Sequence, residues 1–163
     1  MIKYTDCEVV FEEIPDEVTL AINISNCPHH CEGCHSPYLR EDIGTELTFE
    51  ELDKLVKDNE GITCVAFMGE GNDLEALFLL GVYAQNEYKL KVAIYSGSSV
   101  VPKKFWGEFD YIKTGGYKAE LGPLNSPTTN QRLYKRVGIT EAASGVPAIK
   151  WDDITSRFWR TKA

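Results

Sequence analysis

The stretch ITCVAFMGEGNDLEALFLLGVYAQNEYKLKVAIYSG, residues 62–97, decides the fold class of this chain. It begins with an apolar run at residues 62–67 and ends with another at residues 90–95, each with the length and composition of a buried strand. Between them, Asn72 or Asp73 can cap a helix whose apolar residues recur on one face, namely Leu74, Leu77, Phe78 and Val82. A strand, a helix and a strand in this order indicate a parallel βαβ unit.

The sequence on both sides repeats this alternation. Upstream, residues 18–25 form an apolar, β-branched run, and TFEE at residues 48–51 is a capping box that begins an amphipathic helix. Downstream, residues 102–108 predict a short helix and residues 110–113 a further strand. Four strands with three intervening helices predict a parallel sheet with right-handed crossovers.

The ends of the chain are less regular. Residues 8–11 indicate an additional strand, and Pro15-Asp16 a turn before the next one. Near the other end, residues 130–137 could form a strand, and residues 152–159 are expected to form a short closing helix. We expect one domain over residues 1–163, with its core at about 10–137 and an extension at 138–163.

Composition excludes several classes of function. The chain has 163 residues and a net charge of −8, and it has no basic stripe, so we expect no nucleic-acid partner. No apolar run approaches the roughly 18 residues of a membrane span. The first residues do not resemble a signal peptide, so we expect a cytoplasmic protein with no membrane association.

Three of the five cysteines, Cys27, Cys31 and Cys34, fall in the segment CPHHCEGC within a predicted loop at residues 26–45. Thiolates are soft ligands that suit zinc or iron–sulfur clusters. Three sulfurs can hold a [4Fe–4S] cluster, which usually takes four cysteines, and one iron is then open to another ligand. Cys64 lies in an apolar run and Cys7 in a predicted strand, so we expect both to be structural.

The spacing of these cysteines resembles the C-x3-C-x2-C signature of the radical S-adenosylmethionine superfamily. The resemblance implies that the open iron binds the amino and carboxylate groups of S-adenosylmethionine. Reduction of the cluster then breaks a carbon–sulfur bond of the sulfonium and releases a 5′-deoxyadenosyl radical. The spacing alone indicates only a soft site with three sulfurs.

Two further segments are expected to bind S-adenosylmethionine. Superfamily members carry a glycine-rich turn that ends in glutamate, and Gly69-Glu70 is its partial counterpart here, with Met68 in place of the first glycine. Gly69 lets the backbone approach a ligand and Glu70 can accept from an ammonium group. Ser96-Gly97 follows the next strand, where related proteins contact the cofactor, although Ser96 could instead cap the turn that follows it. All these residues follow the carboxyl ends of predicted strands, where parallel sheets bind ligands.

A closer resemblance is to the activating protein of anaerobic ribonucleoside-triphosphate reductase, carried by CPHHCEGCH and by Asn130-Gln131-Arg132. That family uses an electron donor such as flavodoxin or ferredoxin and forms a glycyl radical on the large reductase subunit. It implies a truncated parallel βα barrel, because a closed eight-stranded barrel typically needs about 250 residues. An open side suits a protein loop as substrate better than a small molecule.

Alternatives remain for the cysteine loop. The chain could activate another glycyl-radical enzyme or be another small radical enzyme of the superfamily. The three cysteines could also form a structural zinc site with His29, His30 or His35, in a binding module without catalysis. The roles of these histidines and of Asn130–Arg132 stay open from the sequence: His35 could tune a cluster or be solvated, and Asn130–Arg132 could contact a partner or cofactor or lie on an exposed strand.

Overall fold

The computed structural model describes residues 1–28, 37–141 and 147–159. One mixed sheet with eight strands runs through them in the order β3-β1-β2-β4-β5-β6-β7-β8. Along the chain, the elements are β1 (Lys3–Val10), β2 (Thr19–Ile24), the 3-10 helix η1 (Pro37–Arg40), β3 (Thr45–Glu46), α1 (Phe49–Lys57), β4 (Cys64–Met68), α2 (Leu74–Tyr88), β5 (Lys91–Tyr95), α3 (Lys103–Glu108), β6 (Tyr111–Thr114), β7 (Arg132–Glu141), β8 (Pro147–Asp153) and the 3-10 helix η2 (Thr155–Trp159).

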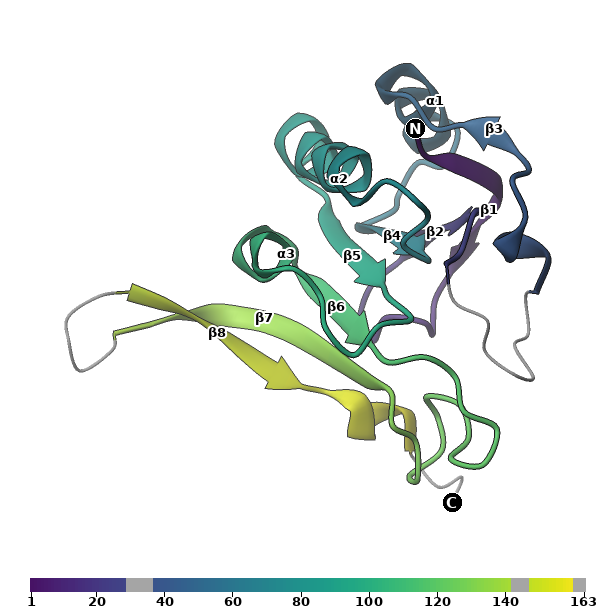
Figure 1. Ribbon diagram of the computed structural model, residues 1–163. Helices are drawn as coiled ribbons and strands as arrows, with labels where there is room; N and C mark the ends of the chain where they lie inside the picture. The colour runs from purple at the N-terminus through teal and green to yellow at the C-terminus, as the bar shows by residue number, and fades with distance from the viewer. Residues whose placement is uncertain (29–36, 142–146, 160–163) are drawn as a thin grey trace.

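The centre of the sheet is parallel. β2, β4, β5 and β6 lie side by side in chain order, and each neighbouring pair is parallel. Right-handed crossovers between strands that are neighbours in this order place every connecting helix on the same face. Figure 1 shows α1, α2 and α3 together on one face of the sheet. The predicted succession of four strands and three helices is therefore confirmed.

The two faces of the sheet are packed differently. The helix face carries large apolar side chains, which form the main core with the three helices: Leu20, Ile22, Val65, Phe67, Val92, Ile94 and Ile112. The opposite face carries smaller ones at its centre, Cys64, Ala66 and Ala93, beside Tyr111 and Leu133. η2 covers part of this second face through Phe158, and Arg157 forms a bidentate ion pair with Asp16 in the β1–β2 turn (2.5 and 3.0 Å).

The predicted helix starts are confirmed, although the Glu51 carboxylate, expected to accept from the Thr48 backbone N–H, accepts from the Tyr4 hydroxyl (2.6 Å). The Thr48 hydroxyl accepts a hydrogen bond from the Glu51 backbone N–H at the start of α1. The Asp73 carboxylate accepts one from the Ala76 backbone N–H at the start of α2 (3.1 Å). Each bond satisfies a backbone donor that has no partner within the helix, and each fixes the first turn of a helix that packs on the sheet.

Three predicted segments differ from the structure in their bounds or their content. The expected helix at residues 152–159 begins only at Thr155, because Asp152 and Asp153 belong to β8. Asp153 ends that strand and caps η2, since its Oδ1 accepts from both the backbone N–H and the hydroxyl of Thr155. The expected loop at residues 26–45 also contains η1, and β3 takes Thr45 and pairs with β1. The expected strand at residues 130–137 begins at Arg132 and continues to Glu141.

The flanks of the sheet are antiparallel, so the fold is mixed rather than wholly parallel. β1 pairs with β2 and β3 on one side, and β7 pairs with β6 and β8 on the other. The sheet is open, with β3 and β8 as its edges. Among the described residues, no helix has the length and apolar composition needed to cross a membrane.

Candidate functional site

The predicted site residues that the structure describes gather at one edge of the sheet. Cys27 follows β2, Gly69-Glu70 follows β4, and Ser96-Gly97 follows β5. These three strands are parallel neighbours, so their carboxyl ends meet at the same edge. This is the edge where open parallel sheets bind ligands.

The loop that contains the cysteine motif is closed at its base. The Cys27 backbone N–H donates to the Leu39 carbonyl (2.7 Å), and the Asn26 N–H donates to the Glu41 carbonyl (3.1 Å). Asn26 has a positive φ of 59°, and its side chain also donates to Asp42 (3.1 Å). Residues 26–27 and 39–41 are therefore bonded to each other directly beyond β2, and Cys27 lies at this junction, half-buried.

Only part of the predicted metal site can be placed. Cys31, Cys34, His29, His30 and His35 lie outside the described residues, so their arrangement stays a prediction. Within residues 1–28, 37–141 and 147–159, no group of three or more His, Cys, Asp or Glu side chains could hold a metal ion.

The other two cysteines lie away from this edge, as expected for structural residues. Cys64 is the first residue of β4, at the opposite end of that strand from Gly69, and it is fully buried. Burial raises the pKa of its thiol, and burial also raises the pKa of half-buried Cys7 in β1. Thiols with raised pKa are poor metal ligands and nucleophiles. Neither residue is placed to add a fourth sulfur to the loop.

Glu70 lies in a turn that only glycines allow. Gly69 and Gly71 on either side of it have φ values of 113° and 63°, in the left-handed region. A Cβ on Gly71 would lie 2.9 Å from Ile24 Cγ2 and 3.4 Å from the Ser25 carbonyl oxygen. The turn therefore packs directly against the end of β2 and the start of the cysteine loop. Glu70 itself is buried there.

Ser96 shapes the next turn. Its backbone N–H donates to the Lys113 carbonyl (2.9 Å), which extends the pairing of β5 with β6 beyond the strand end. Its hydroxyl accepts from the Ser98 backbone N–H (3.0 Å), so it caps the turn, which was one of its two expected roles. The side chain is fully buried. Gly97, which is half-buried, is therefore more accessible than the Ser96 hydroxyl.

Lys113 is a buried residue of this edge that the sequence did not assign. Its ammonium donates to the carbonyls of Ser96 (3.1 Å) and Gly115 (2.7 Å), and it so joins the ends of β5 and β6. The only signal in the sequence is a single charged residue inside the apolar strand YIKT. Lysine is almost never fully buried unless it is paired. The burial of Lys113 therefore indicates that the polar groups at this edge are ordered.

The Asn130–Arg132 segment has mainly structural contacts in the described residues. The Gln131 side chain donates to the Gly115 carbonyl (3.3 Å) and the Asn130 side chain to the Gly116 carbonyl (3.1 Å). Arg132 forms an ion pair with Asp153 (3.6 Å). These residues hold the loop after β6 in place, next to Lys113, at the same edge as the glycine turn.

The edge as a whole combines three properties. It has a loop base with a thiol, a buried carboxylate presented between two left-handed glycines, and backbone turns held by Ser96 and Lys113. A carboxylate in such a place can accept hydrogen bonds from a cationic ligand, and exposed turn backbone can approach a ligand closely. Comparisons of this chain with protein-family models, curated proteins and solved structures give no match.

Proposed function

We propose that this protein is a radical S-adenosylmethionine activase that generates a glycyl radical on anaerobic ribonucleoside-triphosphate reductase. The observation that carries the proposal is the packing of the Gly69–Gly71 turn against Ile24 and Ser25, immediately before the cysteine loop. This packing puts the turn that contains Glu70 against the end of the strand that leads into Cys27, which supports a shared site for the cluster and the cofactor.

The donor set fits a [4Fe–4S] cluster with one open iron. Cys27 lies at the closed base of its loop, and Cys31 and Cys34 follow within that loop. Both remaining cysteines are committed elsewhere, Cys64 at the far end of β4 and Cys7 in β1. Three thiolates and no fourth leave one iron for a ligand that the protein does not supply.

A bound cluster would supply one electron, received from a donor such as flavodoxin or ferredoxin, to split S-adenosylmethionine into methionine and a 5′-deoxyadenosyl radical, which takes a hydrogen atom from a partner glycine and leaves as 5′-deoxyadenosine. This chain holds and orients the cofactor. Glu70 accepts from the methionine ammonium, and Gly69 lets the backbone approach it. Ser96 and Gly97 shape the turn that forms the neighbouring wall.

The architecture supports a protein substrate. Parallel strands in chain order with all helices on one face are also the winding that βα barrels use, and the open sheet with antiparallel flanks is compatible with the partial barrel that we propose. A partial barrel leaves one side of its carboxyl edge uncovered. A glycine loop of a large reductase subunit can reach such a site, whereas small substrates are usually enclosed in deep pockets.

The test is anaerobic reconstitution with iron and sulfide, followed by electron paramagnetic resonance of the reduced protein. We expect a [4Fe–4S]+ signal that shifts when S-adenosylmethionine is added, because the open iron binds it. Cys27→Ser should lose the cluster and all cofactor cleavage. The matched control is Cys7→Ser, which removes a half-buried thiol in β1 and should keep both.

Two other outcomes would contradict this proposal in whole or in part. If the wild-type protein takes up no iron but binds one zinc tightly, and if its zinc affinity depends on the same cysteines, the loop is a structural metal site. If the cluster forms and cleaves S-adenosylmethionine but no glycyl radical appears on the reductase, the protein is a radical S-adenosylmethionine enzyme and the reductase is not its substrate.

A further inference from the structure

Asn26, the residue before Cys27, has a left-handed backbone conformation. Its φ is 59°, and among the residues that the structure describes the other non-glycine residues with positive φ are Asp16 and Lys89. Lys89 is the C-cap of α2 and Asp16 lies in the turn between β1 and β2, both ordinary places for this conformation. Asn26 instead lies between the end of β2 and the cysteine loop. Most side chains are crowded in this conformation, and asparagine is one of the few that adopt it routinely.

The reversal at Asn26 turns the chain out of the sheet. Ser25 still continues the pairing of β2 with β1, because its N–H donates to the Lys3 carbonyl (3.0 Å). One residue later, the N–H groups of Asn26 and Cys27 donate to carbonyls of the returning segment, residues 39–41. The left-handed conformation lies at the change from one set of partners to the other, and it sets the direction in which the chain enters Cys27.

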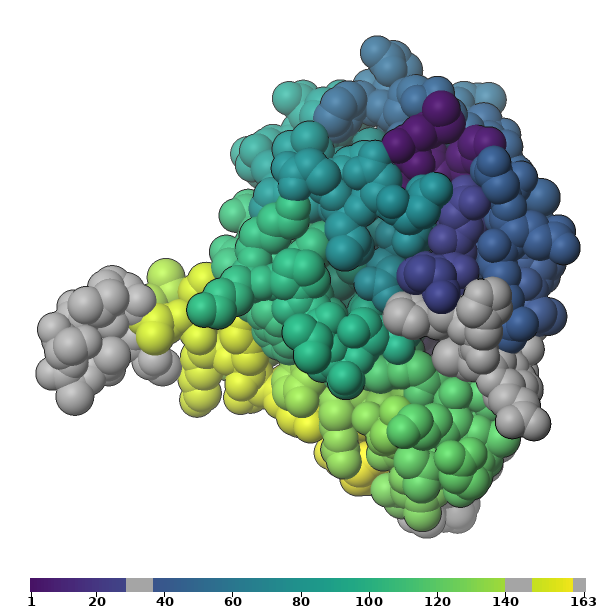
Figure 2. All heavy atoms as spheres, in the orientation of Figure 1, coloured from purple at the N-terminus to yellow at the C-terminus, as the bar shows by residue number. Residues whose placement is uncertain are grey.

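The returning segment is itself held against β1. Gly44 has a φ of 97°, and a Cβ at this position would lie 2.2 Å from the Tyr4 carbonyl oxygen, so the two backbones are in direct contact. The Ser25 hydroxyl donates to the Ile43 carbonyl (2.6 Å). Figure 2 shows the start of the chain (dark purple), the end of β2 (indigo) and the segment before α1 (blue) packed side by side. The carbonyls that accept hydrogen bonds at the loop junction therefore belong to a fixed part of the fold.

The Asn26 side chain adds a second restraint. Its amide donates to Asp42 Oδ1 (3.1 Å), and the Lys3 ammonium donates to the same oxygen (2.8 Å). On the other side of Cys27, Pro28 restricts the residue before it to extended backbone. The backbone of Cys27 is therefore set by its neighbours, and with it the direction of its Cβ. A ligand that is oriented in advance loses less conformational freedom when it binds.

We propose that Asn26 is a positioning residue for Cys27, which it orients as a metal ligand mainly through its left-handed backbone and, to a smaller extent, through its side chain. The proposal rests on the proposed function, in which Cys27, Cys31 and Cys34 hold one cluster. Three thiolates must converge on that cluster, and such a site works only when each ligand is held within about 0.5 Å and 10–20° of its place. A residue that favours negative φ at position 26 would turn Cys27 away from residues 39–41, whereas glycine would not.

The first test compares Asn26→Val with Lys89→Val in the full chain. Both changes put a β-branched residue at a left-handed position, so both should lower the thermal unfolding midpoint of the metal-free protein by a similar amount. Lys89 lies at the end of α2, away from the cysteine loop, so only Asn26→Val should weaken metal binding.

Metal binding is measured anaerobically in two ways. Co2+ is titrated into the metal-free protein and followed by thiolate-to-cobalt charge-transfer absorption, and the reconstituted [4Fe–4S] protein is mixed with an iron chelator. For Asn26→Val we expect about 10-fold weaker Co2+ binding and about 10-fold faster iron release. A tenfold change corresponds to about 1.4 kcal/mol, which lies within the cost of a left-handed conformation for a residue other than glycine.

Asn26→Gly separates the backbone from the side chain. Glycine adopts the same φ without crowding, so Co2+ affinity and the rate of iron release should stay within about 3-fold of the wild type although the amide is gone. If Asn26→Val does not fold, Asn26→Ala replaces it in the comparison, because alanine at this position is less crowded than valine.

Asp42→Ala tests the side-chain restraint. It removes the acceptor for Asn26 and Lys3, and because the Asp42 side chain is exposed we expect Co2+ affinity to fall by only about 2- to 3-fold. Glu41→Ala is the matched control. It removes the same charge one residue earlier but keeps the backbone carbonyl that accepts from the Asn26 N–H, so it should leave the affinity unchanged.

Three results would overturn the positioning proposal. They are metal binding by Asn26→Val as tight as in the wild type, an equal loss in Lys89→Val, which would mean that metal binding follows overall stability, and an equal loss in Asn26→Gly, which would mean that the left-handed backbone does not matter. The two proposals fail separately. If the wild type cleaves S-adenosylmethionine and Asn26→Val holds its cluster equally well, only the positioning falls; if Co2+ binding depends on Asn26 but no cluster forms, only the activase function falls.

Discussion

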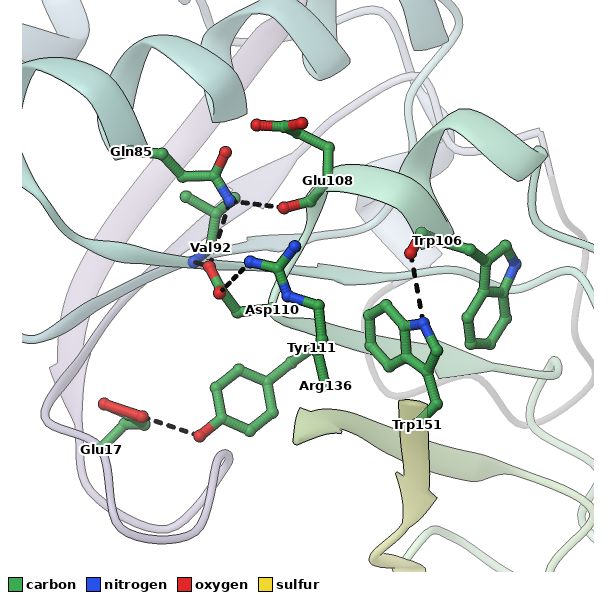
Figure 3. Close-up of polar contacts among 9 residues, drawn as sticks. All are labelled: Glu17, Gln85, Val92, Trp106, Glu108, Asp110, Tyr111, Arg136 and Trp151. Atoms are coloured by element: carbon green, nitrogen blue, oxygen red, sulfur yellow. Dashed lines mark hydrogen bonds and ion pairs between the residues drawn. The ribbon is translucent and has the colours of Figure 1, made fainter. Parts of the chain in front are cut away.

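The two ends of the parallel strands both hold buried polar side chains, but they use them differently. At the amino ends, Glu17 accepts hydrogen bonds from Tyr111 (2.7 Å) and Thr63 (2.8 Å), and the Thr63 hydroxyl in turn accepts from the Val18 N–H (3.0 Å). Figure 3 shows the Glu17–Tyr111 contact. The donors and acceptors satisfy one another, so this end stabilises the fold.

At the carboxyl ends, the polar groups hold backbone turns. Lys113 donates to two carbonyls and Ser96 accepts from a backbone N–H, while Glu70 lies between two glycines. The side chains at this end fix the conformation of the turns. Glycine-containing turns of this type let a ligand approach the backbone closely. In barrels wound from βα units, the amino-end face serves stability and the carboxyl-end face carries the active site. The comparison predicts that matched substitutions at the two ends have opposite consequences.

The largest effect is expected for Glu70→Gln at the carboxyl end. The amide keeps the shape but loses the charge that, in the proposed function, holds the cofactor ammonium, and charge-assisted hydrogen bonds contribute about 1.5–3 kcal/mol. We therefore expect kcat/KM for cleavage of S-adenosylmethionine to fall by about 10- to 100-fold, mostly through KM. Iron content should stay unchanged, since Glu70 is not expected to bind the cluster.

The control for this substitution is Glu60→Gln, on an exposed residue after α1. It should leave both kinetic constants unchanged. If Glu70→Gln leaves KM unchanged while the protein becomes less stable, Glu70 is a structural carboxylate like Glu17, and the two ends would not differ in the way we infer.

Glu17→Gln at the amino end should do the reverse. It weakens the hydrogen bonds from Tyr111 and Thr63 in a buried place, so we expect the free energy of unfolding to fall by about 1–3 kcal/mol. Cofactor cleavage at temperatures where the variant is folded should be unaffected. Urea unfolding followed by circular dichroism, together with the cleavage assay, measures both. A loss of activity without a loss of stability would contradict the division of roles.

The difference between the two ends was only partly predictable from the sequence. The carboxyl end was accessible because its residues follow apolar runs directly, so Cys27, Glu70 and Ser96 could be placed by counting from the strands. The polar cluster at the amino end could not be predicted, because Glu17 and Tyr111 are 94 residues apart and meet only once the sheet has formed. Lys113 was missed for the same reason, since its partners are backbone carbonyls.

The fold shows the same limit. The apolar runs of β2, β4 and β5 and the caps at Thr48 and Asp73 are local signals, and they gave the right elements. β3 has two residues and exists because β1 pairs with it. β8 was taken partly for helix because its last residues resemble a helix start, and Asp153 does cap one, but its pairing with β7 and the packing of Trp151 on Trp106 decide the strand.

Ser96→Ala tests a smaller effect at the carboxyl end. It removes the acceptor for the Ser98 N–H, and such a bond contributes about 0.5–1.5 kcal/mol. We expect a loss of stability in that range and a few-fold rise in KM for S-adenosylmethionine, since the turn near Gly97 loosens. Thr19→Ala, at a fully buried hydroxyl on β2, is a control that should not change KM. An unchanged KM in Ser96→Ala would remove this turn from the cofactor site.

The smallest effect concerns the closed amino end at alkaline pH. Burial, and then the hydrogen bond to Glu17, raise the pKa of Tyr111 above its ordinary value of 10.0. The folded protein therefore keeps a proton that the unfolded chain releases, so this contribution to stability is complete below pH 10 and is lost as the pH rises further. The free energy of unfolding, measured from pH 8 to 11, should fall less steeply in Tyr111→Phe than in the wild type, although the variant starts lower. Parallel curves would mean that Tyr111 releases its proton as readily in the folded protein as in the unfolded chain. The amino end would then be open to solvent. It would not be the buried, fully hydrogen-bonded cluster that distinguishes it from the carboxyl end.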